Sequence, residues 1–296
     1  MNPEKEKWFL LIALSVIWGS SFILIKKSIE YYNPYQVGAL RCLIAGAILL
    51  PYALLNIRKF PKKRLKWLLL AAFTGNFIPM FLFPVAETEI SSIIAGIINS
   101  MMPIFVIVFG ALVWKFETTK RQMIGVAISF AGACILALGS GESGVFKLKP
   151  ILLLLLATGL YAISTTTVKK KLSDIPAVVL SSFVFGAVLF FPSLIALVLS
   201  GFFKDFDFSG NKMTGLGYVS LLSVVGTGLA MMLNYKLLRI SSPLFASTVT
   251  LLMPVVALAW GLLYGENLNV QQFIGGAIII AGLLFLRAKS KKTAIP

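Results

Sequence analysis

The chain has 296 residues, of which 58% are hydrophobic and only 13% are charged. Soluble domains carry roughly 25% charged residues, so this composition excludes an ordinary soluble protein and indicates an integral membrane protein. The net charge of +16 does not indicate nucleic-acid binding, because the basic residues lie in short runs between long apolar stretches. We therefore expect a lipid bilayer, and no nucleic acid, around the protein.

The first half of the chain contains five apolar stretches, each near the roughly 20 residues that a membrane-spanning helix needs. They predict spans at Trp8–Ile25, Pro34–Leu55, Leu65–Pro84, Ile90–Trp114 and Met123–Leu138. Basic residues precede the first stretch, as in a signal peptide. No small-residue cleavage site follows it, so we expect a retained helix.

The second half of the chain contains five further apolar stretches. They predict spans at Pro150–Thr167, Ala177–Leu199, Leu216–Leu237, Pro243–Leu263 and Val270–Leu286. With ten spans and both termini in the cytoplasm, most of the 27 Lys and Arg residues fall on the cytoplasmic side. The sequence thus predicts a multi-pass protein of the bacterial inner membrane with cytoplasmic N- and C-termini.

Several short motifs of the first half recur in the same order in the second half. The matched pairs are Ile90–Ser92 with Ile240–Ser242, Gln122–Gly125 with Gln272–Gly275, Gly132 with Gly282, Pro103 with Pro254, Glu117 with Glu266, Trp18 with Tyr161, and Lys26 with Lys169. Each half holds five predicted spans, and five is odd, so the halves must enter the membrane from opposite sides. We predict an all-α fold of two inverted five-helix repeats, residues 1–140 and 141–296. Such repeats are typical of secondary transporters that bind substrate where the halves meet.

Polar and aromatic side chains inside the predicted spans are candidates for a substrate site, because polar groups facing lipid would be costly. The candidate substrate-binding residues are Trp18, Ser21, Asn76, Asn99, Tyr161, Asn234 and Thr248. Hydrogen bonding or packing between helices is the alternative role for each of them.

Pro103 and Pro254 lie midway through their predicted spans. A proline leaves the carbonyl four residues earlier without its helical partner, here Asn99 and Thr250. These sites are candidates for helix kinks that contact substrate or act as gates, with a packing kink as the alternative. Arg41 is the one strong charge well inside a predicted span. We favour a structural anchor that reaches outward over the binding of an anionic group or a carbonyl cluster.

The eleven Asp and Glu residues all fall in tails, loops or span ends, and the chain has no histidine. These residues form no recognisable catalytic group, metal site or cofactor site, so we expect a protein that is not an enzyme. The missing mid-membrane carboxylate also disfavours a proton-coupled exporter of cationic drugs. A neutral, zwitterionic or anionic small molecule is the expected substrate.

Motifs in both halves resemble one known family of permeases. The motifs are Trp18–Phe22, Pro34 with Arg41 and Ala45, Pro254 with Gly265 and Glu266, and Gly275–Gly276 with Ala281–Gly282. They resemble the EamA-type ten-helix permeases of the drug/metabolite transporter superfamily. The resemblance implies export of metabolites or amino acids through a central cavity that the first four helices of each half surround. A multidrug exporter of aromatic or cationic compounds is the alternative, and either a monomer or a homodimer fits the sequence.

Overall fold

The computed structural model describes residues 2–138, 148–205, 207, 210–263 and 270–287, which fold into helices without a strand. Seven helical stretches are long and apolar enough to cross a membrane. They are Pro3–Ile29, Pro34–Leu55, Lys62–Glu87, Ile94–Trp114, Leu148–Lys171, Ala177–Leu199 and Gly210–Ile240. Each overlaps a predicted span, so the expected all-helical, multi-spanning fold is confirmed for the described part of the chain.

The other three predicted spans correspond to helices that are shorter or more polar. The helix at Lys120–Leu138 begins with two basic residues, and the apolar helices at Pro243–Val256 and Phe273–Phe285 are shorter. The count of ten spans therefore stays a prediction. Gly265 and Glu266, and the predicted repeat boundary at residues 140 and 141, lie outside the described residues.

The spans are built from consecutive helical elements. In the first half these are α1 (Pro3–Ile29), α2 (Pro34–Leu55), η1 (Ile57–Lys59), η2 (Lys62–Arg64), α3 (Leu65–Ala72), η3 (Phe73–Phe77), α4 (Ile78–Glu87), α5 (Ser92–Asn99), α6 (Met102–Trp114) and α7 (Lys120–Leu138). In the second half they are α8 (Leu148–Lys171), α9 (Ala177–Ser182), η4 (Phe183–Leu189), α10 (Phe190–Leu199), α11 (Phe202–Asp205), α12 (Gly210–Ser223), η5 (Val224–Leu229), α13 (Ala230–Ile240), α14 (Pro243–Ser247), α15 (Val249–Leu263) and α16 (Val270–Arg287).

Serine side chains fix the start of one short helix in each half. Ser91 Oγ accepts a hydrogen bond from the Ile94 amide at 3.3 Å at the start of α5. Ser242 Oγ accepts one from the Phe245 amide at 3.1 Å at the start of α14. Such caps satisfy amides that the first helical turn leaves free. The recurring Ile-Ser-Ser motif therefore marks both helix starts, with the cap on its first serine in the first half and on its second serine in the second half.

Three of the spans contain π-helical turns that the sequence did not predict: η3, η4 and η5. A π turn adds a residue to the turn and rotates the following helix, and such turns are frequent at functional sites. In η5 the wide turn is supported by Thr227, whose hydroxyl donates to the Leu222 carbonyl at 3.2 Å. Helical periodicity alone gives no signal for such local widening.

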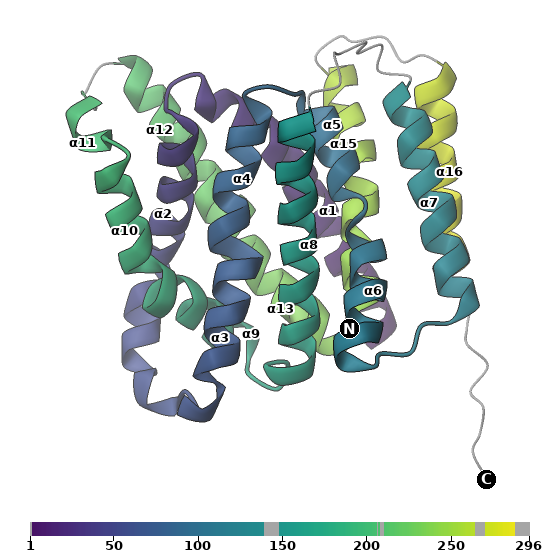
Figure 1. The fold of residues 1–296 in the computed structure, drawn as a ribbon, viewed down its shortest axis with the longest axis horizontal. Coiled ribbons are helices and arrows are strands. Elements are labelled where there is room, and N and C mark those ends of the chain that lie inside the picture. The colour runs from purple at the N-terminus through teal and green to yellow at the C-terminus, as the bar shows by residue number, and fades with distance from the viewer. Residues whose placement is uncertain (1, 139–147, 206, 208–209, 264–269, 288–296) are drawn as a thin grey trace.

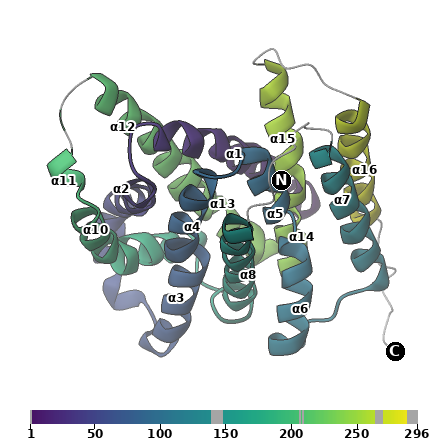
Figure 2. The same cartoon turned by 45° about the horizontal axis from the view of Figure 1, so that its top comes forward.

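Helices α7 and α16 lie side by side at one edge of the molecule, while α2 and α10–α12 form the opposite edge (Figures 1 and 2). Close approach of α7 and α16 depends on glycine. A Cβ atom at Gly132 would lie 2.8 Å from the Gly275 carbonyl oxygen, and one at Gly282 would lie 2.8 Å from the Gly125 carbonyl oxygen. Small residues at helix contacts are the usual means of tight packing in membranes.

The surface of the helix assembly is apolar. Leu55, Leu112 and Leu199 are each more than three-quarters exposed, and many other large hydrophobic side chains point outward with them. Soluble proteins do not expose apolar surface over whole helices. This exterior suits the hydrocarbon core of a membrane.

Candidate substrate cavity

A cavity of about 90 Å³ lies between helices from both halves of the chain. A buried water needs roughly 10–15 Å³ by this measure, so the cavity has room for several waters or a small solute. Its walls come from α1, α2, η3, α4, α5, α6, α8, η5, α13, α14 and α15. Among the described residues, none of those in Ala177–Leu199 lines it, so that span departs from the arrangement that the family resemblance implied.

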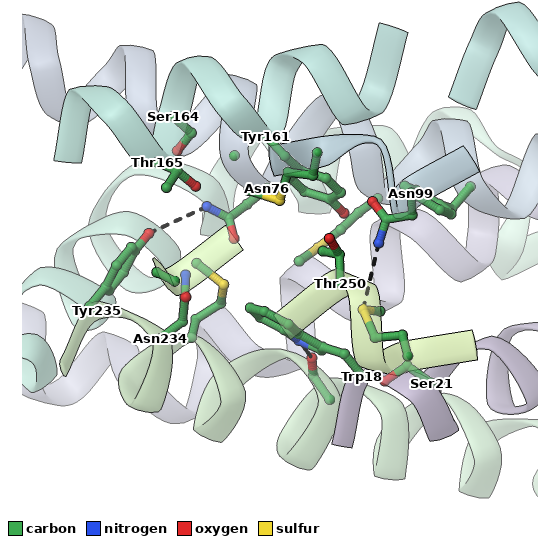
Figure 3. Close-up of a pocket in the computed structure, with 18 of the residues that line it drawn as sticks. Trp18, Ser21, Asn76, Asn99, Tyr161, Ser164, Thr165, Asn234, Tyr235 and Thr250 are labelled. Atoms are coloured by element: carbon green, nitrogen blue, oxygen red, sulfur yellow. Dashed lines mark hydrogen bonds between the residues drawn. The ribbon is translucent and has the colours of Figure 1, made fainter. Parts of the chain in front are cut away.

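Six of the seven predicted substrate-binding residues line this cavity. They are Trp18, Ser21, Asn76, Asn99, Tyr161 and Asn234. Figure 3 shows Tyr161, Ser164 and Thr165 facing Trp18 and Ser21 across it. The structure therefore brings together residues that lie up to 216 positions apart, from Trp18 to Asn234.

Thr248 is buried but is not among the cavity-lining residues. It lies at the break between α14 and α15, and its hydroxyl donates to the Phe245 carbonyl of its own segment at 2.7 Å. Thr250, two residues later, lines the cavity instead. The sequence identified the polar segment, but the break in the helix decides which threonine faces inward.

The matched aromatic residues Trp18 and Tyr161 are both held in place. Trp18 Nε1 donates to the Gly226 carbonyl in η5 at 3.0 Å, which gives the indole the partner that a buried N–H needs. The ring of Tyr161 stacks on Phe83, with centroids 5.9 Å apart. Contacts with neighbouring helices therefore hold an aromatic ring on each of two facing sides of the cavity.

Two amide oxygens in the cavity have no hydrogen-bond partner. Asn76 Nδ2 lies 3.5 Å from the Tyr235 hydroxyl and Asn99 Nδ2 lies 3.7 Å from Met253 Sδ, but Oδ1 of each asparagine is buried and unpaired. A buried acceptor without a donor costs about 1–3 kcal/mol. Unpaired acceptors that line a cavity are suited to a bound donor group.

Arg41 is only 6% exposed and lines the cavity, so it does not reach outward as the sequence analysis favoured. Its Nη2 donates to Thr227 Oγ1 at 3.4 Å, and its Nε has no partner. The guanidinium is always protonated, so it gives the cavity a fixed positive charge. An anionic group of a bound molecule would be attracted by this charge.

The two prolines occupy different places in their helices. Pro103 lies in the first turn of α6, directly after the helix is interrupted at Ser100 and Met101. Pro254 lies inside α15. The Thr250 carbonyl, which Pro254 was expected to leave free, accepts a hydrogen bond from Ser100 Oγ at 3.0 Å. This carbonyl therefore joins the two halves at their helix breaks.

Several cavity residues were missed or discounted by sequence reasoning. Ser164 and Thr165 line the cavity but are not among the predicted site residues, because hydroxyls often bond their own helix. Ser164 instead donates to the Ala71 carbonyl across a helix contact at 3.0 Å. Tyr235 was not considered, although it adjoins Asn234. The sequence signal that could have identified Tyr235 is its position directly after Asn234, a polar residue inside a predicted span.

Two lysines make matching contacts at helix ends. Lys26 Nζ donates to the carbonyl of Glu87, the last residue of α4, at 2.8 Å. Lys169 Nζ donates to the carbonyl of Leu238, near the end of α13, at 2.8 Å. A cation at a helix C-terminus pairs with carbonyls that lack helical partners. Each lysine follows a matched aromatic residue, Trp18 or Tyr161, by eight positions.

Glu87 is fully buried, although the sequence places it at a span end. Among the described residues, no group of three or more His, Cys, Asp or Glu side chains could hold a metal ion. The chemistry of the cavity is thus that of the Arg41 guanidinium, amides, hydroxyls and aromatic rings, with the buried carboxyl of Glu87 nearby.

Comparison with known proteins agrees with a transport fold. The model of the EamA-like transporter family matches residues 7–138 and again residues 148–288. An uncharacterized transporter of Archaeoglobus fulgidus is 26% identical over 96% of this chain and 99% of its own length. The uncharacterized inner membrane transporter YedA of Escherichia coli K12 is 29% identical, with 94% of this chain and 90% of YedA covered.

Another relative is named for its substrates. The probable amino-acid metabolite efflux pump of Salmonella typhimurium LT2 is 26% identical over 95% of this chain and 94% of its own length. A solved crystal structure shares the fold with a TM-score of 0.73 and 16% identity, covering 96% of both chains. With the family model matching most of the chain, this protein belongs to the EamA-like transporter family of membrane transporters.

Proposed function

We propose that this transporter moves small zwitterionic metabolites, amino acids first among them, across a bacterial inner membrane by alternating access. The observation that carries the proposal is the set of unpaired polar atoms in one cavity: Arg41 Nε, Asn76 Oδ1 and Asn99 Oδ1. A guanidinium is a good partner for a carboxylate, and amide oxygens accept hydrogen bonds from an ammonium group. An α-amino acid carries both groups on its α-carbon.

The proposal includes ten spans in two inverted five-helix repeats, residues 1–140 and 141–296, with both termini in the cytoplasm. The contacts of α7 and α16 support the inversion, because Gly132 meets Gly275 while Gly282 meets Gly125. This pattern is antiparallel and reciprocal, as expected for related helices that cross about a two-fold axis. The two separate matches of the family model and the matching lysine contacts give further support.

Export is the proposed direction, and its support is the Salmonella relative that is named a probable efflux pump. Alternating access is supported by contacts between the halves at their helix breaks, such as the bond from Ser100 to the Thr250 carbonyl. Helix breaks at a central cavity are common in carriers whose repeats move against each other. Pro103 and Pro254 are proposed to act as bending points in that motion.

Export of aromatic or cationic drugs is the second candidate function. The aromatic rings of Trp18, Phe22, Phe83 and Tyr161 that line the cavity favour it, because such rings bind flat apolar compounds. The buried positive charge of Arg41 opposes binding of a cation in the same cavity. The two functions therefore differ in the charge of the substrate that they require.

Counterflow into liposomes that contain the purified protein tests the proposal. Radiolabelled leucine, threonine, lysine and glutamate would be offered against unlabelled amino acid inside, with ethidium efflux measured in parallel. We expect saturable counterflow of a neutral amino acid, strongly reduced by Trp18→Ala and Arg41→Gln. Ethidium efflux without counterflow of any amino acid would reject amino acids as the substrates and favour the drug exporter.

A further inference from the structure

The buried carboxyl group of Glu87 lies between the cavity and one end of the third span. Glu87 is the last residue of α4 and has no exposed surface. Phe83, one turn before Glu87, lines the cavity. Thr88 and Glu89, which follow Glu87 in the chain, are exposed. Glu87 is therefore one helical turn from the cavity and adjoins the surface.

Neighbouring helices leave one oxygen of this carboxyl group free. Ser92 Oγ donates to Oε2 at 3.0 Å and also lies 3.4 Å from the carbonyl of Phe22, a cavity residue. Lys26, which is exposed, donates to the main-chain carbonyl of Glu87 at 2.8 Å. The Oε1 atom is buried without a partner.

The titratable and charged groups that face Glu87 come from three helices. Lys26 on α1 and Arg41 on α2 carry positive charge toward it. Tyr161 on α8 stacks on Phe83 one turn away, and α5 contributes the hydroxyl of Ser92. Glu87 is thus electrostatically linked to Arg41, a cavity residue, and physically linked to the surface through Lys26.

A buried carboxyl group with a free oxygen is suited to exchanging a proton. The ionised form is stabilised by nearby cations and by water, and the neutral form is favoured when water and cations withdraw. In a carrier, the access of water to groups beside the cavity changes as the halves move. Intramembrane carboxyl groups in transporters commonly act as proton relays for this reason.

We propose that Glu87 is the proton-coupling group of this transporter. The Glu87 carboxylate takes one proton from water on the side of the membrane where water reaches the end of α4. After the halves have moved, it releases that proton to water on the other side. The proton is held on a carboxyl oxygen of Glu87 in between, and no other bond changes. This inference rests on the proposed carrier function.

Glu87→Gln tests the inference, because glutamine keeps the shape of the side chain and a polar contact with Ser92 but cannot exchange a proton. Glu30→Gln is the matched control, since Glu30 is an exposed carboxylate that pairs with Lys27 at 2.9 Å. Counterflow at equal pH is measured first in liposomes with the amino acids named above. Accumulation driven by a gradient of one pH unit, imposed in either direction with the potential clamped to zero, is measured next.

With one proton per substrate, a gradient of one pH unit supports accumulation of up to about tenfold. We expect the wild type and Glu30→Gln to accumulate label, and Glu87→Gln to exchange label at equal pH but reach only equal concentrations under the gradient. Gradient-driven accumulation by Glu87→Gln at the wild-type level would overturn the inference. So would a wild type that exchanges label but does not respond to the gradient.

Glu87→Asp decides the outcome if Glu87→Gln has lost exchange as well. This variant keeps a carboxyl group, and we expect it to retain gradient-driven accumulation; its loss with exchange intact would contradict the inference. Failure of the wild type to exchange any amino acid at equal pH would instead reject the proposed function, and the coupling role with it.

Discussion

The helix ends held by Lys26 and by Lys169 have the same main-chain arrangement and different side-chain chemistry. Each lysine donates to a carbonyl at 2.8 Å near the end of a helix that contributes to the cavity. The accepting residue is Glu87 in the first half and Leu238 in the second, and both are buried. The carbonyl of the exposed Arg239 also accepts from Lys169, at 3.3 Å. A shared contact can thus hold the helices of both halves although only the first half has a buried ionisable side chain on the accepting residue.

The largest expected effect comes from making the second helix end resemble the first. Leu238→Glu removes a buried leucine and introduces a carboxyl group without the serine that Glu87 has. We expect a loss of about 3–5 kcal/mol in the free energy of unfolding. Thermal unfolding in detergent measures the change, with Leu238→Met as the volume-matched control. A Leu238→Glu protein as stable as the wild type would show that the two ends are chemically interchangeable.

The reciprocal α7–α16 contact offers a second test of how alike the halves are. Gly132→Ala places a methyl group 2.8 Å from main-chain atoms of Gly275 and Ile279, which cannot move aside as a flexible side chain could. We expect a cost of about 1–3 kcal/mol. Gly276→Ala is the control, because nothing lies within 4 Å of a Cβ atom there. Equal thermal stability of the two variants would contradict the packing described for these helices.

Replacing Lys26 and Lys169 one at a time measures how much each lysine contact contributes to stability. Lys169 is partly buried, whereas Lys26 is exposed. We expect Lys169→Met to lower the free energy of unfolding by about 1–2 kcal/mol and Lys26→Met to lower it by less, because a charged hydrogen bond is stronger away from water. Chemical denaturation in detergent measures both, and the reverse order would contradict the account.

The smallest effect is expected at a contact outside the membrane, where Arg64 of the first half pairs with Asp174 of the second. The Arg64 guanidinium that donates to Asp174 holds the pKa of that carboxyl below its usual value. The pair therefore stabilises the fold above the unfolded-state pKa of aspartate, about 4, and this contribution is lost as the pH falls through the lower folded-state pKa.

Because both side chains of this pair are more than a third exposed, we expect Asp174→Asn to cost at most about 1 kcal/mol at neutral pH. The difference from the wild type should vanish in acid, and unfolding curves across pH measure it. A difference that persists unchanged at pH values well below the aspartate pKa would show that the ion pair is not its source.

Much of the fold could be predicted from the sequence because membrane spans have a strong composition signal. Pro34–Leu55 and Ala177–Leu199 have the predicted ends. The π turns could not be predicted, since they depend on local packing such as the bond from Thr227 to the Leu222 carbonyl. The burial of Glu87 could not be predicted for a related reason: its place at a span end is correct and indicates water, but Ser92 at the start of α5 donates to its carboxyl group and the side chain is buried.

The candidate site was predicted largely from polar residues within spans, because a polar side chain that faces lipid is costly and such residues therefore point inward. Asn76 and Asn99 line the cavity as expected from their cost in lipid. Arg41 could not be oriented from sequence, because an arginine two turns from a membrane surface can reach outward or inward. The position of Thr248 depended on where the helix breaks, and the proline six residues later did not reveal that.

Alkylation of a single cysteine tests whether one cavity opens to each side of the membrane in turn. Thr165 lines the cavity and is buried, so Thr165→Cys would be made in a chain with Cys42 and Cys134 replaced by alanine. A membrane-impermeant maleimide would be added to one side of sealed vesicles or to the other. If access alternates, we expect labelling from both sides, at rates that a transported amino acid changes. Labelling from one side only under every condition would contradict alternating access.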